Sequence, residues 1–250
     1  MKLRHVIVAL AASAVATFGP AYGQTTEEQS DGQAIGQVAS GLAGRIGSAA
    51  QDIGGDEVIA FNGVETFAMA STYKVAIAAA VLDRVDRGEL SLDQMADVPP
   101  DMYVAGTVAI AERFPYAGVQ FSLANLIYAM ITESDNTATD VLIGLAGGAE
   151  AVTENLRRLG ITDFRVDRTV REILMDFYSL PVVTPEAVVE AISKNPALVA
   201  AQVGPNPDFE ADPRDHTTPN AYLKLLLAID AGTAMSPESR EFLLDVMSRT

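Results

Sequence analysis

The chain has 250 residues and no cysteine, and its 33 acidic residues against 17 basic ones give a formal net charge of −16 at pH 7. The absence of cysteine excludes disulfides, a thiolate metal site and a cysteine nucleophile. The two histidines, His5 and His216, are too few for a His-rich metal site. Because so acidic a chain lacks the excess of Lys and Arg that nucleic-acid phosphates require, we expect no nucleic-acid partner.

The first 23 residues have the composition of a cleaved export signal. Lys2, Arg4 and His5 form a basic start, Val6–Phe18 is an apolar run of 13 residues, and Ala21-Tyr22-Gly23 offers small residues where a signal peptidase reads them. The alternative is a membrane anchor, but a run of 13 residues is shorter than the roughly 20 that cross a bilayer. We therefore predict a periplasmic or secreted protein with no membrane contact once residues 1–23 are removed.

Residues 24–250 are enough for one domain with its own core. Cleavage would remove two basic residues, Lys2 and Arg4, and no acidic one, so the remaining chain would carry a formal charge of −18. We interpret this charge as a solubilising surface, and we expect a monomer.

Helix and strand patterns follow one another after the signal. Apolar residues at helical spacing predict an amphipathic first helix over residues 34–50; they are Ile35, Val38, Leu42 and Ile46. Residues 57–70 instead predict a β-hairpin around the turn signal Asn62-Gly63. Its strands would contain Val58, Ile59 and Phe61 before the turn and Val64 and Phe67 after it.

The rest of the chain is mainly helical. Apolar residues recur every three to four positions in seven segments, which are 72–87, 122–132, 137–146, 149–158, 185–194, 218–231 and 237–248. Several begin at Ser, Thr or Asp caps and end at Gly88, Gly160 or Gly232. Residues 203–215 are rich in Pro and Asp and predict an irregular loop. Strands followed by a helical block indicate an α+β fold rather than alternating β and α elements.

Ser71 and Lys74 stand at the start of the most apolar of these helical segments. Residues three apart share a helix face, so the lysine amine can come within hydrogen-bond reach of the hydroxyl. A serine needs a base to attack a carbonyl, and a lysine whose pKa is lowered by burial can serve as that base. Free N–H groups at the helix start can also hold an oxyanion. Taken alone, the pair is better explained as a capping serine beside an unrelated lysine.

A second polar group, Ser134-Asp135-Asn136, begins 60 residues beyond Lys74, between two helical segments. A serine there can pass a proton to a leaving nitrogen, and an asparagine amide can accept from a lysine and donate to a carbonyl. The three residues are also favoured helix caps. Capping and catalysis are compatible roles.

In this order the two motifs resemble those of the class A β-lactamases and penicillin-binding proteins. Their flanks, Phe67-Ala68-Met69-Ala70 and Ile131-Thr132-Glu133, resemble the family too, and other family segments follow in the same order. Those segments are Gly147-Gly148, Val166-Asp167-Arg168 and Asp215-His216-Thr217-Thr218-Pro219. The resemblance runs from about residue 34 to the end of the chain, which is identified as a member of this superfamily.

The resemblance implies an all-helical lobe beside an α/β lobe with an antiparallel sheet. It also implies a β-lactam substrate that is hydrolysed through a serine acyl-enzyme without metal or cofactor. Ser71 is then the acylated nucleophile, Lys74 assists its deprotonation, and Ser134 passes the proton to the ring nitrogen. Asn136 binds the side-chain amide of the substrate.

Three further residues take roles from the resemblance. Tyr103 lines the rim of the pocket, unless it is an ordinary exposed surface residue. Arg168 and Asp215 resemble the salt-bridged pair that closes the neck of the family's omega loop, with a generic surface pair as the alternative. The segment from Asp167 to Asp215 spans 48 positions and is longer than the family's loop, with room for extra helices at 172–179 and 185–202.

The sequence departs from the family at the base that releases the acyl group. The family's glutamate follows the Asp-Arg pair by two residues, where this chain has Val170. Glu172 is the candidate replacement, helped by Asp176, or else it is a solvent-facing helix residue. If no base is present, a penicillin-binding D,D-peptidase or a slowly deacylating protein becomes the alternative. A third alternative is a non-catalytic sensor or pseudoenzyme.

The family's Lys-Thr-Gly motif is also missing. The lysines after Lys74 are Lys194, followed by Asn195, and Lys224, followed by Leu225. In the family this motif lies on a strand after the helix that would end here near Arg249. The simplest expectation is that the sequence stops before the C-terminal strands of the sheet.

Overall fold

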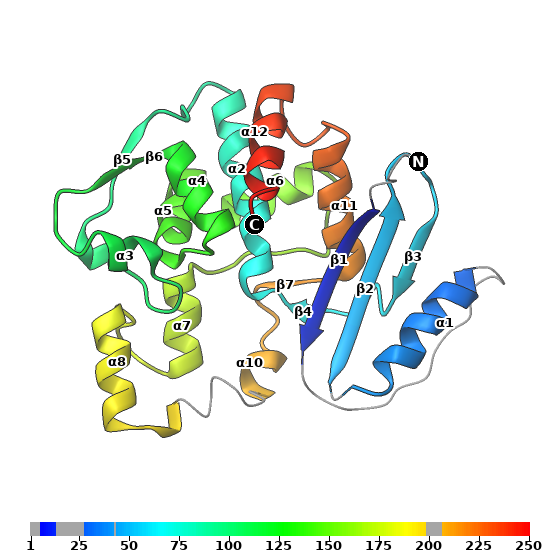
Figure 1. Ribbon diagram of the computed structural model, residues 1–250, viewed down its shortest axis with the longest axis horizontal. Helices are drawn as coiled ribbons and strands as arrows, with labels where there is room; N and C mark the ends of the chain where they lie inside the picture. Colours follow the sequence, from blue (N-terminus) through cyan, green and yellow to red (C-terminus); the bar gives the residue numbers. More distant parts are fainter. Residues whose placement is uncertain (1–5, 14–27, 43, 199–206) are drawn as a thin grey trace.

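The computed structural model describes residues 6–13, 28–42, 44–198 and 207–250, which form a helical lobe and a sheet lobe (Figure 1). The strands are β1 (Val6–Ser13), β2 (Arg45–Asp52), β3 (Val58–Phe61), β4 (Phe67–Ala68), β5 (Met95–Asp97), β6 (Gln120–Ser122) and β7 (His216–Thr217). The 3₁₀ turns are η1 (Ala70–Tyr73) and η2 (Pro100–Met102). The helices are α1 (Glu28–Ala39), α2 (Lys74–Asp86), α3 (Ala109–Arg113), α4 (Leu123–Thr132), α5 (Asn136–Ala146), α6 (Ala149–Arg158), α7 (Val170–Tyr178), α8 (Pro185–Lys194), α10 (Pro207–Ala211), α11 (Pro219–Asp230) and α12 (Pro237–Met247).

Helix α2 is the centre of the main core. Every residue from Lys74 to Leu82 is buried, and α2 packs against α4, α5, α6 and α12. Alanines at 76, 78, 79 and 80 let these neighbours approach closely on all sides of the helix. A helix that is apolar around its whole circumference is stable only inside such a bundle, so its first turn is held firmly in place. The helix that the sequence predicts over 72–87 is thereby confirmed.

The sheet has the order β1-β2-β3, and both pairs are antiparallel. Helix α11 packs on β1 and β2, and α1 lies along β3. Two smaller antiparallel pairs, β4 with β7 and β5 with β6, lie outside this sheet, and β6 contacts α4 in the helical lobe. The architecture confirms the α+β class.

The N-terminal strand falls within the predicted export signal. Strand β1 pairs with β2 over its whole length, from Val6 opposite Asp52 to Ser13 opposite Arg45. The predicted cleavage site at Ala21-Tyr22-Gly23 lies outside the described residues. Removal of residues 1–23 therefore stays a prediction, and it would take β1 away from β2.

The predicted amphipathic helix over 34–50 is wrong in its second half. Helix α1 ends at Ala39, and residues 45–52 form β2 instead. Val38 and Leu42 are 74% and 57% exposed, so their helical spacing marks no buried face. Residues 45–52 form a strand because β3 and β1 pair with both edges of β2. The glycine at 47 also lets the Phe67 ring pack closely, since a Cβ at Gly47 would stand 2.5 Å from a carbon of that ring.

The predicted hairpin over 57–70 is half right. Strand β3 ends at the expected turn, where Asn62 has a φ of 50° and its carbonyl accepts the Glu65 N–H. The second strand, however, does not return along β3. Val64 is 79% exposed, and Phe67 pairs with Thr217 of β7. This long-range pairing ties the segment before Ser71 to the end of the long 167–215 segment.

The neck of that segment is closed by the predicted ion pair. Arg168 Nε donates to Asp215 Oδ2 at 2.6 Å, and both residues are buried. Asp215 Oδ1 also accepts the backbone N–H groups of Asp167 and Arg168, while the Asp215 N–H donates to Asp167. Arg168 makes further ion pairs with Asp176 and Asp212. The pair is therefore structural and buried, not a generic surface pair.

Between the two ends of the neck the chain forms α7, α8 and α10. The helix predicted over 172–179 corresponds to α7. The helix predicted over 185–202 corresponds to α8 only in its first part, because α8 ends at Lys194. The loop expected over 203–215 contains the short helix α10, and residues 199–206 lie outside the described residues.

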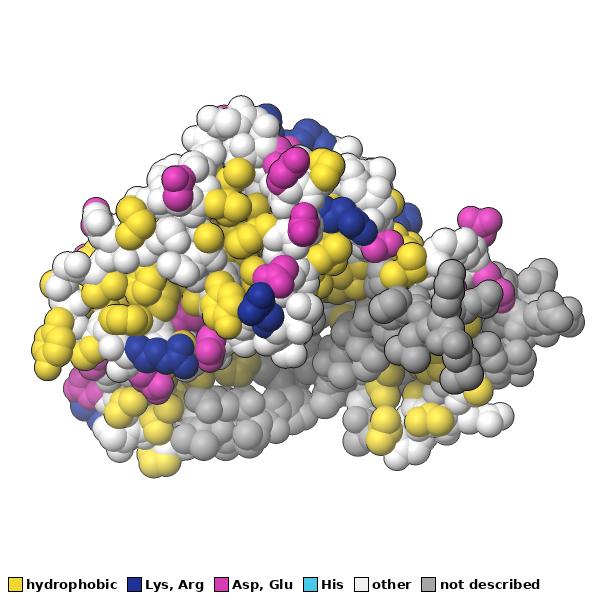
Figure 2. Space-filling view, turned by 45° about the horizontal axis from the view of Figure 1, so that its top comes forward, with side chains coloured by type: hydrophobic (Ala, Val, Ile, Leu, Met, Phe, Trp, Pro, Cys, Tyr) yellow, Lys and Arg dark blue, Asp and Glu magenta, His cyan; other side chains and the backbone are white. Residues whose placement is uncertain are grey.

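Acidic side chains are spread over the helical lobe among apolar and basic ones on the face shown in Figure 2. This dispersal fits a solubilising surface better than a concentrated binding patch. Within the described ranges, no helix is long and apolar enough to cross a membrane.

Replacing Asp215 by Ala should lower the free energy of unfolding by about 3 kcal/mol, since it leaves the buried Arg168 guanidinium and two N–H groups with fewer acceptors. The matched control is Asp245→Ala, which breaks an ion pair to Arg249 whose side chains are more than half exposed. That change should stay within about 0.5 kcal/mol of wild type in urea unfolding. Equal losses in the two variants would contradict a structural neck.

Candidate active site

Ser71 is presented by the turn that starts α2. It lies in η1, which runs directly into α2, and its side chain is exposed while Tyr73 and Lys74 are 3% exposed. Ala70 has a φ of 44°, a left-handed conformation that costs a non-glycine residue energy. The Met69 N–H donates to the Asp215 carbonyl at 3.2 Å, so the neck described above also anchors this turn.

Lys74 is the buried cation of the site. Among the described residues, its Nζ donates to the Ser134 carbonyl at 2.6 Å, to Ser134 Oγ at 3.0 Å and to Asn136 Oδ1 at 3.1 Å. Burial lowers the pKa of Lys74 to about 8, against the opposing effect of the Asp135 and Asp140 carboxylates. At pH 7 roughly a tenth of the amine is therefore neutral and able to accept a proton.

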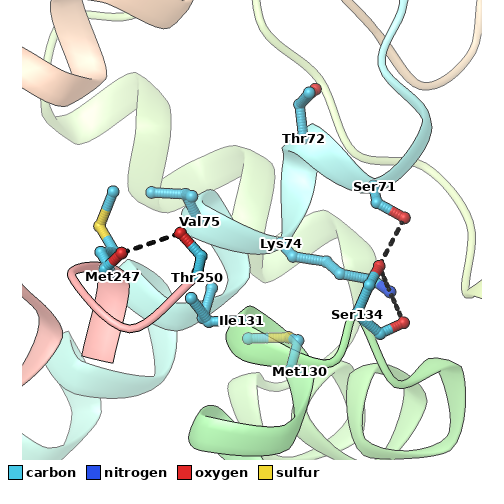
Figure 3. Close-up of a pocket in the computed structure, with 9 residues that line it drawn as sticks. All are labelled: Ser71, Thr72, Lys74, Val75, Met130, Ile131, Ser134, Met247 and Thr250. Atoms are coloured by element: carbon cyan, nitrogen blue, oxygen red, sulfur yellow. Dashed lines mark hydrogen bonds between the residues drawn. The ribbon is translucent and has the colours of Figure 1, made fainter. Parts of the chain in front are cut away.

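Ser134 connects Lys74 to Ser71 (Figure 3). Its Oγ donates to Ser71 Oγ at 3.0 Å and accepts from Lys74 Nζ. Ser134 has a φ of 54°, which turns its carbonyl and its hydroxyl toward the same amine. The helical spacing of Ser71 and Lys74 predicts direct reach between them, whereas the hydrogen-bond path that the structure shows runs through Ser134.

Asp135 fixes the turn between α4 and α5. It is fully buried, and its carboxylate accepts the N–H groups of Ala138 at 2.7 Å and Ile110 at 2.8 Å. The capping role that the sequence offers for this motif is confirmed for Asp135. The cap holds Ser134 and Asn136, its two neighbours, in register with Lys74.

Asn136 uses both ends of its amide within the protein. Its Nδ2 donates to the Ala105 carbonyl at 2.7 Å, while its Oδ1 accepts from Lys74. Its backbone N–H donates to the Thr107 carbonyl. Nδ2 carries a second hydrogen that a carbonyl can accept, but Asn136 is buried and is not among the residues that line the cavity described next.

A cavity of about 340 Å³ opens beside Ser71. Figure 3 shows the hydroxyls of Ser71 and Ser134 and the amine of Lys74 converging at one side, with α4 and the end of α12 forming the opposite wall. The lining residues are Ser71, Thr72, Lys74, Val75, Met130, Ile131, Ser134, Met247 and Thr250. A mostly apolar wall with a few convergent polar groups is typical of a small-molecule site.

Tyr103 does not lie in this lining. Its side chain is 4% exposed, and its hydroxyl donates to the Phe114 carbonyl. Burial, and next the Asp135 carboxylate, raise the pKa of the Tyr103 hydroxyl, so it stays a donor. Both sequence interpretations of Tyr103 are corrected, since it is neither exposed nor at the cavity wall, but instead anchors the loop before β6.

Glu172 lies on the exposed side of α7, outside the cavity lining. Its Oε2 accepts the Thr169 N–H at 2.8 Å and the Thr169 hydroxyl at 3.0 Å, while its own N–H donates to that hydroxyl. This reciprocal capping box favours the structural alternative for Glu172. The expected helper Asp176 is paired with Arg168 and Arg214 instead.

The sequence reasoning missed Asp140. Its carboxylate oxygens accept the N–H groups of Val170 at 2.7 Å and Arg171 at 3.0 Å, so it joins α5 to the start of α7. Burial raises the pKa of Asp140 to about 6 against the effect of those hydrogen bonds. The sequence did contain a signal for Asp140, because it is the one charged residue of α5 and lies one helical turn after Asn136.

A metal centre has no support in the described ranges, where no group of three His, Cys, Asp or Glu side chains could hold an ion.

Known proteins share the fold and much of the sequence of this chain. The profile of the β-lactamase enzyme family matches residues 32–250. A β-lactamase of Rhodobacter capsulatus is 31% identical over 222 residues, which is 86% of this chain and 61% of that protein. Among solved structures, a β-lactamase from Chitinophaga pinensis has a TM-score of 0.68 at 26% identity, covering 87% of this chain and 69% of that one. An ancestral class A β-lactamase has a TM-score of 0.68 at 31% identity, covering 88% and 71%.

The α+β fold and a Ser-x-x-Lys helix start beside a Ser-Asp-Asn turn define the superfamily of serine β-lactamases and penicillin-binding proteins. Within it, the chain belongs to the β-lactamase enzyme family. It spans about six-tenths of the length of the first curated relatives it matches.

The lowered pKa of Lys74 should be visible directly. The Cε signal that disappears from NMR spectra in Lys74→Met should titrate in wild type with a midpoint of about 8. Because the folded pKa is lowered, the unfolded chain binds more protons between pH 8 and about 10.4. Wild type should therefore gain stability relative to Lys74→Met as pH rises through that window. A midpoint above pH 10 would contradict the buried site.

Proposed function

We propose that the chain carries out β-lactam hydrolysis through an acyl-enzyme on Ser71. The observation that carries the proposal is the hydrogen-bond chain from Ser71 through Ser134 to the buried Lys74. In the structure Lys74 donates to Ser134 and Ser134 donates to Ser71. When the amine is neutral the same groups can donate in the reverse order, and the amine then receives the proton that the nucleophile must lose. The export signal predicted over residues 1–23 would place this activity in the periplasm or outside the cell.

The proposed chemistry uses Ser71, Lys74 and Ser134 at the cavity wall, together with Asn136, which accepts a hydrogen bond from Lys74. Ser71 Oγ attacks the carbonyl carbon of the β-lactam ring, and its proton moves to Lys74 by way of Ser134. As the ring C–N bond breaks, Ser134 returns a proton to the nitrogen. Asn136 donates to the side-chain carbonyl of the substrate, and the apolar wall formed by α4 and α12 contacts its apolar part.

A second candidate function is stable acylation, as in a penicillin-binding or slowly deacylating protein. Two observations favour it over rapid hydrolysis. Val170 occupies the position expected for the deacylating glutamate and is buried. Glu172, its candidate replacement, binds Thr169 in an exposed cap. The first step, acylation of Ser71, is common to both candidates.

Acylation can be tested by intact mass after brief incubation with a penicillin. Wild type should gain the mass of one ligand, and Ser71→Ala should gain none, because the nucleophilic oxygen is lost. Ser193→Ala, which removes an exposed hydroxyl on α8, should be acylated like wild type. An adduct that persists in Ser71→Ala would place the nucleophile elsewhere, and no adduct in any variant would favour a non-catalytic role.

Turnover of a chromogenic cephalosporin separates the two candidates. If Glu172 activates the hydrolytic water, wild type turns over steadily, and Glu172→Gln keeps fast acylation but loses release of product by roughly 10²–10⁴-fold. If the acyl-enzyme is stable, wild type gives a burst of one equivalent followed by near silence. Steady turnover that survives Glu172→Gln would rule out this residue as the base. Glu186→Gln on α8 is the control for a change of charge.

A further inference from the structure

The turn between α7 and α8 contacts the loop that holds Asn136. The Ala105 N–H donates to the Val183 carbonyl at 2.8 Å. Val183 is fully buried, and Ala105 is 3% exposed. Together with Val188 they form a small apolar cluster that is separate from the main core. Side chains of α7, α8 and their connection pack around it, namely Leu174, Met175, Tyr178, Leu180 and Ile192. We call α7, α8 and the residues between them the arm.

Ala105 faces the arm with its N–H and the active site with its carbonyl, which accepts Asn136 Nδ2. The next residue, Gly106, has a φ of 94°, and a Cβ built there would stand 2.6 Å from Asn136 Nδ2. A side chain at this position would displace the amide, so the loop depends on glycine for its close approach. The loop and the amide therefore move together.

The amide passes this constraint on to the lysine. Because the group is planar, the position of Nδ2 fixes the direction of Oδ1, which accepts from Lys74 Nζ at 3.1 Å. Three hydrogen bonds in series thus join Val183 to Ala105, Ala105 to Asn136, and Asn136 to Lys74.

The arm holds the same loop region at a second point. Arg171 Nη2 donates to the Asp101 carbonyl at 3.0 Å. The start of α7 is itself fastened to α5 by Asp140. With one contact near each end of the 101–105 segment, the arm limits its rotation as well as its distance from α5.

We propose that the arm is a positioning element of the Ser71 centre, and that Val183 is the positioning residue through which it orients Asn136 and, by that amide, Lys74. The inference rests on the proposed acylation of Ser71. It gives the long segment between Asp167 and Asp215 a role in the first chemical step, separate from release of the acyl group.

The inference predicts how a truncation of Val183 changes both the acylation rate and the pKa of Lys74. Truncating Val183 loosens the cluster and lets Ala105 and the amide drift. Since an error of about 1 Å in a catalytic group costs about 100-fold, a partial loosening should slow acylation about tenfold. The ammonium form of Lys74 also loses one of its oxygen acceptors, so its pKa falls below the value of about 8 that burial already produces.

The experiment compares Val183→Ala with Val189→Ala, the same truncation on α8 at a residue that is 68% exposed. Stopped flow with a chromogenic cephalosporin gives the second-order acylation rate from pH 6 to 9.5. We expect Val183→Ala to acylate about tenfold more slowly. The acylation rate should rise with pH as Lys74 loses its proton, and in Val183→Ala the midpoint of that rise, the acidic limb of the profile, should lie about half a pH unit lower. Val189→Ala should match wild type in both measurements.

Gly106→Ala places a methyl group against the Asn136 amide from the loop side. It should likewise slow acylation and lower the pH midpoint of the acylation rate. Its effect should combine with that of Val183→Ala less than additively, because the two act through one hydrogen-bond series. If Val183→Ala does not fold, Gly106→Ala decides by the same two readouts, and an unshifted limb overturns the inference.

A purely structural arm gives a different result. Val183→Ala would then have a lower free energy of unfolding in urea, but its acylation rate and the pH midpoint of that rate would equal those of Val189→Ala. That result would overturn the inference. The absence of an adduct in wild type would instead overturn the proposed function and this inference with it.

Discussion

The burial of the Lys74 amine is the constraint on which the rest of the site depends. Removing an ammonium group from water costs several kcal/mol unless oxygens replace its hydration. Ser134 and Asn136 supply those oxygens, and both lie at the turn between α4 and α5. That turn must therefore keep a fixed position against α2. The left-handed backbone of Ser134 is the strained conformation that brings its carbonyl and hydroxyl to the same amine.

Two carboxylates beneath the turn act both electrostatically and architecturally. Asp135 and Asp140 each raise the pKa of Lys74 against the larger effect of burial. Asp135 also caps α5 and holds Ile110, while Asp140 holds the start of α7. The groups that tune the lysine are thus the groups that join α5 to its neighbours, so the charge of the site and its geometry cannot vary independently.

The backbone N–H groups at the start of α7 are satisfied by side chains close to the helix end. Thr169 and Glu172 satisfy each other, and Asp140 takes the next two N–H groups. Every one of these contacts stabilises the helix end. They also keep the Glu172 carboxylate on the exposed side of the helix, while Val170 presents only an apolar side chain. The start of α7 is consequently a place where this chain departs from the glutamate that the family resemblance leads one to expect.

The sequence by itself determined the features that depend on neighbours within a few turns. Helices α2, α4, α5, α6, α8, α11 and α12 follow from apolar spacing with capping residues and terminal glycines. The order of the Ser71 and Ser134 motifs likewise gave the superfamily, and four of the six candidate residues, Ser71, Lys74, Ser134 and Asn136, do come together.

Only the tertiary structure decided the features that need a partner far along the chain. Residues 45–52 became a strand because two other strands pair with them, and Phe67 paired with Thr217 instead of folding back on β3. Tyr103 is buried, and the Phe114 carbonyl eleven residues further on offsets the cost by accepting its hydroxyl. Lys74 meets Ser71 through Ser134 because three elements converge there. Such contacts depend on which surfaces meet after folding, and periodicity within one segment carries no information about its partner.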